Sequence, residues 1–140
     1  MPKTIVQRVV FKNAKTGDLY DLYMNPKKHA HISGGPVKVS GRVGAKFSAF
    51  GGYITGRNLH LVKNRLIVQS WRGSDWKKSD LDSTFVIHLE QKGKDVILLA
   101  THANVPDKHV PGITKGWHKH YWNQWKRHLT GKERTHISGM

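Results

Sequence analysis

Histidines, aromatic rings and cations supply most of the side chains in this sequence that could do chemistry. The densest group is "GWHKHYWNQWKRHL", from Gly116 to Leu129, with three tryptophans, one tyrosine, three histidines and three cationic residues. Such a set could grip a nucleic acid, lie on a membrane surface or close over a hydrophobic core. The choice among these three roles depends on whether the aromatic rings and the cationic side chains lie on the same face of a helix or strand.

Two His-x-His pairs, His29 with His31 and His118 with His120, raise the question of a metal site. On a helix, residues two apart point about 200° apart, so neither pair can close on one ion. A zinc site takes three or four ligands, and the chain has no cysteine to supply a thiolate. We therefore predict no native metal site and no cofactor.

Catalytic patterns are absent from the sequence. The nine carboxylates fall mostly in turns and helix starts, and no pair is placed to act as acid and base. There is no Gly-Lys-Ser/Thr phosphate loop and no serine-centred elbow. We predict a protein that is not an enzyme and has no catalytic residues. The remaining catalytic alternative is an enzyme that works through His102 or His118 on a bound substrate.

The charge of the chain is strongly positive. Lys and Arg number 24 against 9 Asp and Glu, a formal net charge of +15, and no carboxylate occurs between Asp21 and Asp75. Such a field attracts polyanions and acidic partners, although a cationic surface can also serve solubility alone. Without a reading helix or a ring-and-cation platform, any binding to nucleic acid should be weak, sequence-independent and abolished by moderate salt.

Size and apolar runs indicate one domain. The chain has 140 residues, of which 37% are hydrophobic, and no run approaches the length of a transmembrane helix. "MPKTIVQRVVF" lacks the features of a signal peptide, because Gln7 and Arg8 interrupt its apolar run. We expect a single domain over residues 1–130, a flexible tail over 131–140, and a cytoplasmic protein without a membrane span.

The elements that must position these side chains follow from periodicity. A first strand is predicted over residues 4–11, and an antiparallel series follows after Pro36. In "STFVIHLE", Phe85, Ile87 and Leu89 alternate with polar neighbours. Further strands are predicted at residues 46–50, 58–62, 65–71 and 95–103.

Two short helices are predicted between the first strand and this series. Asn13 is the expected N-cap of a helix that ends near Met24. Pro26 suits the first position of the second helix, and Gly34 follows its end.

The last helix is predicted from about Thr114 to Leu129, and it answers the question raised by the aromatic stretch. Trp117, Tyr121 and Trp125 recur every four residues with Leu129, while the lysines fall on the other side. The rings are thus separated from the cations, as in a helix that covers an antiparallel sheet. At 100° per residue, His118 and His128 fall within the apolar stripe and His120 faces away.

This order of elements, with "GAKFSAFGGYITGRNLHLVKNRLIVQSWR", "STFVIHLE", "ATHANVP" and "GWHKHYWNQWKRHL", resembles the family of homologues of the activator of heat-shock-protein ATPase. That family belongs to the START/birch-allergen-like superfamily. The resemblance covers roughly Val6 to Leu129. It implies an α+β helix-grip fold, in which a curved antiparallel sheet wraps around the long C-terminal helix and two short helices follow the first strand.

The resemblance also implies a cavity between the sheet and the helix. Members of the superfamily carry lipids, sterols or polyketides, some do chemistry, and one branch activates a cytosolic chaperone. We expect a carrier or sensor of a small apolar or amphipathic molecule, or alternatively a co-chaperone-like protein that binds an acidic partner. The cavity residues expected are Phe47, Trp71, Phe85, His102, Trp117, His118 and Tyr121. The residues expected to contact an anionic group or partner are Arg42, Lys46, Arg57 and Arg72.

Overall fold

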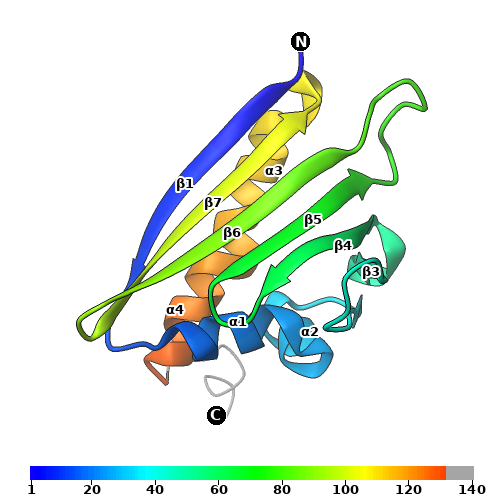
Figure 1. Ribbon diagram of the computed structural model, residues 1–140. Helices are drawn as coiled ribbons and strands as arrows, with labels where there is room; N and C mark the ends of the chain where they lie inside the picture. The colour runs from blue at the N-terminus through cyan, green and yellow to red at the C-terminus, as the bar shows by residue number, and fades with distance from the viewer. Residues whose placement is uncertain (132–140) are drawn as a thin grey trace.

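The computed structural model describes residues 1–131 and contains one seven-stranded antiparallel sheet (Figure 1). The strand order is β1-β7-β6-β5-β4-β3-β2. The first strand of the chain therefore lies at one edge of the sheet, paired with the last strand. The strands are β1 (Lys3–Phe11), β2 (Val37–Lys38), β3 (Lys46–Ala49), β4 (Ile54–Val62), β5 (Leu66–Gly73), β6 (Ser83–Lys92) and β7 (Asp95–Val105). The predicted α+β helix-grip architecture is confirmed.

Alternation along the strands separates the two faces of the sheet. In β6, Phe85, Ile87 and Leu89 are buried, while His88 and Glu90 are exposed, as the sequence pattern predicted. The buried face packs against the rings of the last helix. Among residues 1–131, no helix is both long enough and apolar enough to cross a bilayer.

Two short helices, α1 (Thr16–Met24) and α2 (Pro26–Ser33), lie at one end of the sheet (Figure 1). Asn25 caps α2 by accepting hydrogen bonds from the backbone N–H groups of Lys27 and Lys28. Gly34 ends α2 in the left-handed conformation, with a φ of 89°, as predicted for a glycine at this position.

The predicted N-cap of α1 is wrong. Asn13 lies in the turn after β1 with a φ of 50°, and its backbone N–H donates to Asp95 at the start of β7. The helix begins later, after Lys15, which offers no side-chain cap. Asn13 tolerates this left-handed conformation better than most residues, so the residue suits the turn instead of the cap.

The last helix consists of α3 (Val110–Trp117), one π-helical turn, η3 (His118–Trp122), and α4 (Asn123–Leu129). It runs diagonally across one face of the sheet (Figure 1). It begins about four residues earlier than predicted, because Pro111 fits the first turn of a helix, where its missing N–H has no partner to lose.

A buried glutamine fixes the helix to the edge strand β1. Gln7 accepts a 2.6 Å hydrogen bond from the Trp122 indole N–H, and its amide group donates to the carbonyl of Thr114 at 3.2 Å. Both polar ends of this side chain are therefore satisfied inside the core, as a buried amide requires. The two bonds connect α3, through Thr114, and η3, through Trp122, to the edge strand.

Candidate ligand-binding cavity

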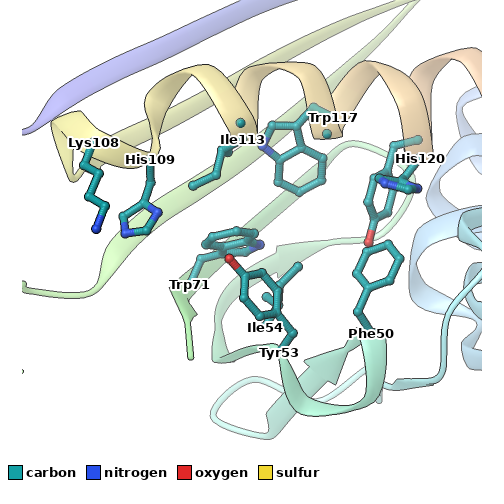
Figure 2. Close-up of a pocket in the computed structure, with 12 residues that line it drawn as sticks. Phe50, Tyr53, Ile54, Trp71, Lys108, His109, Ile113, Trp117 and His120 are labelled. Atoms are coloured by element: carbon teal, nitrogen blue, oxygen red, sulfur yellow. The ribbon is translucent and has the colours of Figure 1, made fainter. Parts of the chain in front are cut away.

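A cavity of about 510 Å³ opens between α3 and the turn that joins β3 to β4 (Figure 2). Trp71 of β5 lies at its base, and Trp117 and Tyr121 of the long helix form one wall. The full lining consists of Phe50, Tyr53, Ile54, Trp71, Lys108, His109, Gly112, Ile113, Gly116, Trp117, His120 and Tyr121.

The π-helical turn places the rings of the long helix. In an uninterrupted α-helix, residues five apart lie about 140° apart around the axis. The wider turn of a π-helix brings such residues into line. Trp117 and Trp122 accordingly stack with their ring centres 5.6 Å apart and an angle of 14° between the planes. Trp117 stacks on its other side against Phe85, at 4.0 Å and 6°.

A chain of hydrogen bonds orients the Trp117 ring. The indole N–H donates to Nδ1 of His102 at 3.1 Å, and Nε2 of His102 donates to the hydroxyl of Ser83 at 2.8 Å. The Ser83 hydroxyl in turn donates to the carbonyl of Trp71 at 2.7 Å. Both nitrogens of the imidazole are therefore used, and burial lowers the pKa of His102 to about 3, so the ring is neutral.

A second chain holds Tyr121. Its hydroxyl donates to Nε2 of His29 at 2.8 Å, and Nδ1 of His29 donates to the carbonyl of Tyr23 at 2.8 Å. Burial lowers the pKa of His29 to about 4 and raises the pKa of Tyr121. The Tyr23 hydroxyl donates to Gln69 at 2.7 Å, which links α1 to the sheet. Helix α2 thus supports the cavity wall from behind.

The opposite wall is the turn η1 (Phe50–Gly52), whose three residues have positive φ angles of 51°, 66° and 98°. A bulky residue rarely adopts this conformation, and such strain collects at functional sites. The Phe50 ring packs over Gly35, where an added Cβ would lie 2.5 Å from the ring. It also meets His120 edge-on at 5.1 Å. Phe50 therefore closes one end of the cavity against η3.

The other end of the cavity is polar. Lys108 and His109 lie there (Figure 2), and His109 stacks on Trp76 at 5.8 Å. Tyr53 on the rim donates its hydroxyl to Asp75 at 2.9 Å. Burial, followed by this bond to the carboxylate and by its charge, raises the pKa of Tyr53 to about 12. The mouth of the cavity, beyond its aromatic walls, thus has the positive charge of Lys108 and the negative charge of Asp75 near it.

The predicted cavity residues separate into two groups. Trp71, Trp117 and Tyr121 line the cavity. Phe85 and His102 are buried in the core beside Trp117 and make ring contacts with it.

The other predicted cavity residues lie elsewhere. Phe47 packs over Gly56 of the neighbouring strand, where an added Cβ would lie 2.6 Å from its ring and 1.8 Å from the Ser70 carbonyl oxygen. His118 is exposed, whereas the half-buried His120 lines the cavity. The placement from a regular 100° step was wrong, because the π-helical turn contains an extra residue. His128, also predicted within the stripe, is half-buried.

The four predicted anion contacts do not gather at the mouth of the cavity. Arg42, Lys46 and Arg57 are exposed near β3 and β4, where Arg57 donates to the carbonyl of Gly44 at 2.9 Å. Arg72 is engaged within the β5–β6 connection, where it donates to the carbonyls of Lys77 and Asp80 and pairs with Asp82 at 3.3 Å. The cation at the cavity is Lys108.

Sequence reasoning missed most of the rim. Phe50 was placed at the end of the strand predicted over residues 46–50, and Tyr53, Lys108 and His109 are in segments for which no element was predicted. The consecutive glycines after Phe50 were the available signal, because they favour a left-handed turn that directs its flanking rings. Within residues 1–131, no three His, Asp or Glu side chains gather as metal ligands.

Comparison with known proteins gives the same architecture. An HSP90 activator from Plasmodium falciparum superposes with a TM-score of 0.83 at 23% identity, over 91% of this chain and 96% of that one. CalU16 from Micromonospora echinospora superposes with a TM-score of 0.78 at 18% identity, over 96% of this chain and 79% of that one. At these identities the likeness shows the fold alone.

Sequence relatives are longer than this chain. An activator of 90 kDa heat shock protein ATPase homolog from Dictyostelium discoideum is 29% identical over 101 residues, which are 71% of this chain and 26% of that protein. An uncharacterized protein from Schizosaccharomyces pombe is 36% identical over 64 residues, 46% of this chain and 19% of that one. This chain therefore spans at most about a quarter of either relative. The family model for Activator of Hsp90 ATPase homolog 1-like protein matches residues 13–130, and the chain belongs to that family.

Proposed function

We propose that this protein binds one small, largely apolar molecule in the cavity between α3 and η1, as a carrier or a sensor. The observation that carries the proposal is the cavity itself, about 510 Å³ in volume and walled mainly by aromatic rings. Ligand sites usually measure about 300–1,000 Å³ and combine apolar walls with a few polar groups. The polar groups here are Lys108 and His109 at the mouth and His120 at the far end.

The proposed role is binding without chemistry. His102, the best catalytic alternative in the sequence, is buried, and its two nitrogens are held by Trp117 and Ser83. A general base must reach a substrate proton with a free nitrogen. His118, the other alternative, is exposed outside the cavity.

A thermal-shift screen of fatty acids, sterols and flavonoids tests this function. A ligand at 100 times its dissociation constant adds about 2.7 kcal/mol of stability, which raises the melting temperature by several degrees in a domain of this size. Tyr53→Ala, which removes one aromatic ring from the rim of the cavity, should weaken binding about tenfold. Leu99→Ala on the outer face of β7 is the matched control, because the two residues are 40% and 39% exposed. The absence of any shift near millimolar ligand would contradict the proposal.

A second candidate function is binding of an acidic protein partner. Lys46 and Arg57 lie directly opposite each other on β3 and β4, and both are exposed. Like charges at such a cross-strand pair destabilise a sheet. No carboxylate pairs with either side chain within residues 1–131. An acidic partner would offset this repulsion, and the Dictyostelium relative, named as a heat shock protein ATPase activator, makes Hsp90 the first partner to test.

Charge reversal tests this candidate. The double variant Lys46→Glu/Arg57→Glu should weaken binding to purified Hsp90 at least tenfold, measured by calorimetry at low salt. Lys92→Glu/Lys94→Glu, at the β6–β7 turn, makes the same change in net charge at another exposed site and should have a much smaller effect. Equal effects of the two double variants would show that only the net charge matters.

Random-sequence DNA should bind this protein weakly and should be released by moderate salt.

A further inference from the structure

Two glycines of α3 leave space along one wall of the cavity. Gly112 and Gly116 both line it and lie one helical turn apart. A Cβ built on either would meet no atom within 4 Å outside the helix itself. Neither glycine has a positive φ. Neither packing nor backbone conformation therefore requires glycine here, although glycine weakens a helix relative to alanine.

Other glycines of this fold show the contrast. At Gly35 an added Cβ would lie 2.5 Å from the Phe50 ring, and at Gly56 it would lie 1.8 Å from a backbone oxygen. Those two positions need glycine because neighbouring atoms occupy the space. At Gly112 and Gly116 the same space belongs to the cavity. The missing side chains widen the cavity along about 6 Å of the helix.

Aromatic rings form most of the walls that face this space, with Ile54 and Ile113 completing the apolar lining. The hydrogen-bond donors of three of these rings are already used. Trp117 donates its N–H to His102, Tyr121 donates its hydroxyl to His29, and Tyr53 donates to Asp75. A hydrogen-bond acceptor of a ligand beside these three rings would receive no hydrogen bond from them, because each of their donors is already used, and it would lose its bonds to water. Flat apolar rings can instead stack on them, at an offset or edge-on.

Polar groups of a ligand can be accommodated at one end of the cavity, its mouth. Lys108 is exposed at the mouth, and no carboxylate pairs with it within the described chain. Asp107 pairs with Lys3 at 3.1 Å, and Asp75 accepts the Tyr53 hydroxyl. Lys108 is therefore available to meet an anionic substituent while the rings enclose the remainder of the molecule.

From this arrangement we infer that the ligand is a flat, fused-ring aromatic compound, that it lies against the Gly112–Gly116 surface of α3, and that its acidic group faces Lys108. This inference rests on the proposed ligand-binding function and names the chemical class. Gly116 is the residue that determines specificity, because it lies beside Trp117, in the part of the cavity where a planar ring fits between the helix and the base formed by Trp71.

A pair of probes with one carbon skeleton separates shape from hydrophobicity. 2-Naphthoic acid is flat, and decahydro-2-naphthoic acid has the same skeleton with puckered rings. Calorimetry should show that the flat acid binds at least tenfold more tightly. Decanoic acid, a flexible chain with a carboxylate, should also bind more weakly than 2-naphthoic acid. Equal or tighter binding of the saturated acids would overturn the inference and leave the proposed function standing, whereas no binding of any of the three would count against both.

Variants of α3 test the position. Gly116→Leu should fold, with a melting temperature at or above that of the unmodified protein, and should lose at least 90% of 2-naphthoic acid binding. Lys115→Leu places the same side chain on the exposed outer side of the same helix and should bind normally. Lys108→Gln should weaken 2-naphthoic acid but leave neutral 2-naphthamide unchanged. A folded Gly116→Leu variant that still binds 2-naphthoic acid would refute the inference.

Discussion

Trp117→Ala should cost about 3–5 kcal/mol of unfolding free energy, the range for a large aromatic side chain removed from a core. Trp117 is only 3% exposed and is stacked between Phe85 and Trp122. Its loss would leave a void and would also remove the N–H group that donates a hydrogen bond to Nδ1 of His102. Urea unfolding followed by circular dichroism measures the change.

Two further variants complete this test. One separates the lost hydrogen bond from the lost side-chain volume, and the other is a control on the same helix. Trp117→Phe keeps most of the ring but removes the N–H donor, so it should cost about 1–3 kcal/mol, the range for a buried acceptor left unsatisfied. Lys119→Ala, on the exposed side of the same helix, should change stability by less than about 0.5 kcal/mol. A loss under about 1 kcal/mol for Trp117→Ala would show that the ring is not buried in solution.

Acidification should destabilise the fold through its two buried histidines. Burial lowers the pKa from 6.5 to about 4 for His29 and to about 3 for His102. Below pH 6.5 the unfolded chain binds protons at both rings and the folded chain does not, so stability falls as the pH decreases. Each histidine contributes up to about 1.4 kcal/mol per pH unit, which gives a total loss of about 4 kcal/mol between pH 6.5 and 4.5.

Urea unfolding at a series of pH values measures this dependence. His29→Asn and His102→Asn should each remove about half of the slope between pH 6.5 and 4.5. His60→Asn, at an exposed position in β4, should leave the slope as it is. A slope that neither buried variant reduces would mean that both histidines become protonated in the folded protein.

The sequence by itself determined the types and order of the elements and the antiparallel sheet, because the evidence for them is local, whereas the wrapping of a curved sheet around the last helix was implied by the family resemblance. Alternation in "STFVIHLE" assigned Phe85 to the buried face, and short connections between strands required an antiparallel sheet. Asn25, Pro26 and Gly34 bound α2 with side chains and backbone angles that act within a few residues. Segregation of rings from lysines assigned the last helix to the core. Each of these signals depends only on residues that are close together in the chain. It can therefore be recognised from the sequence without the tertiary structure.

The candidate site depends on contacts that the sequence does not encode locally. The π-helical turn at His118–Trp122 brings Trp122 against Trp117, which also stacks on Phe85, 32 residues earlier in the chain. The same turn exchanges the positions expected for His118 and His120. Phe50 reaches the cavity because Gly35, on a different segment, leaves room for its ring. The charges expected to gather at the cavity lie apart from it, since electrostatic contacts between exposed side chains are too weak to direct folding. Only the packed tertiary structure decided which rings enclose the cavity and which cation lies at its mouth.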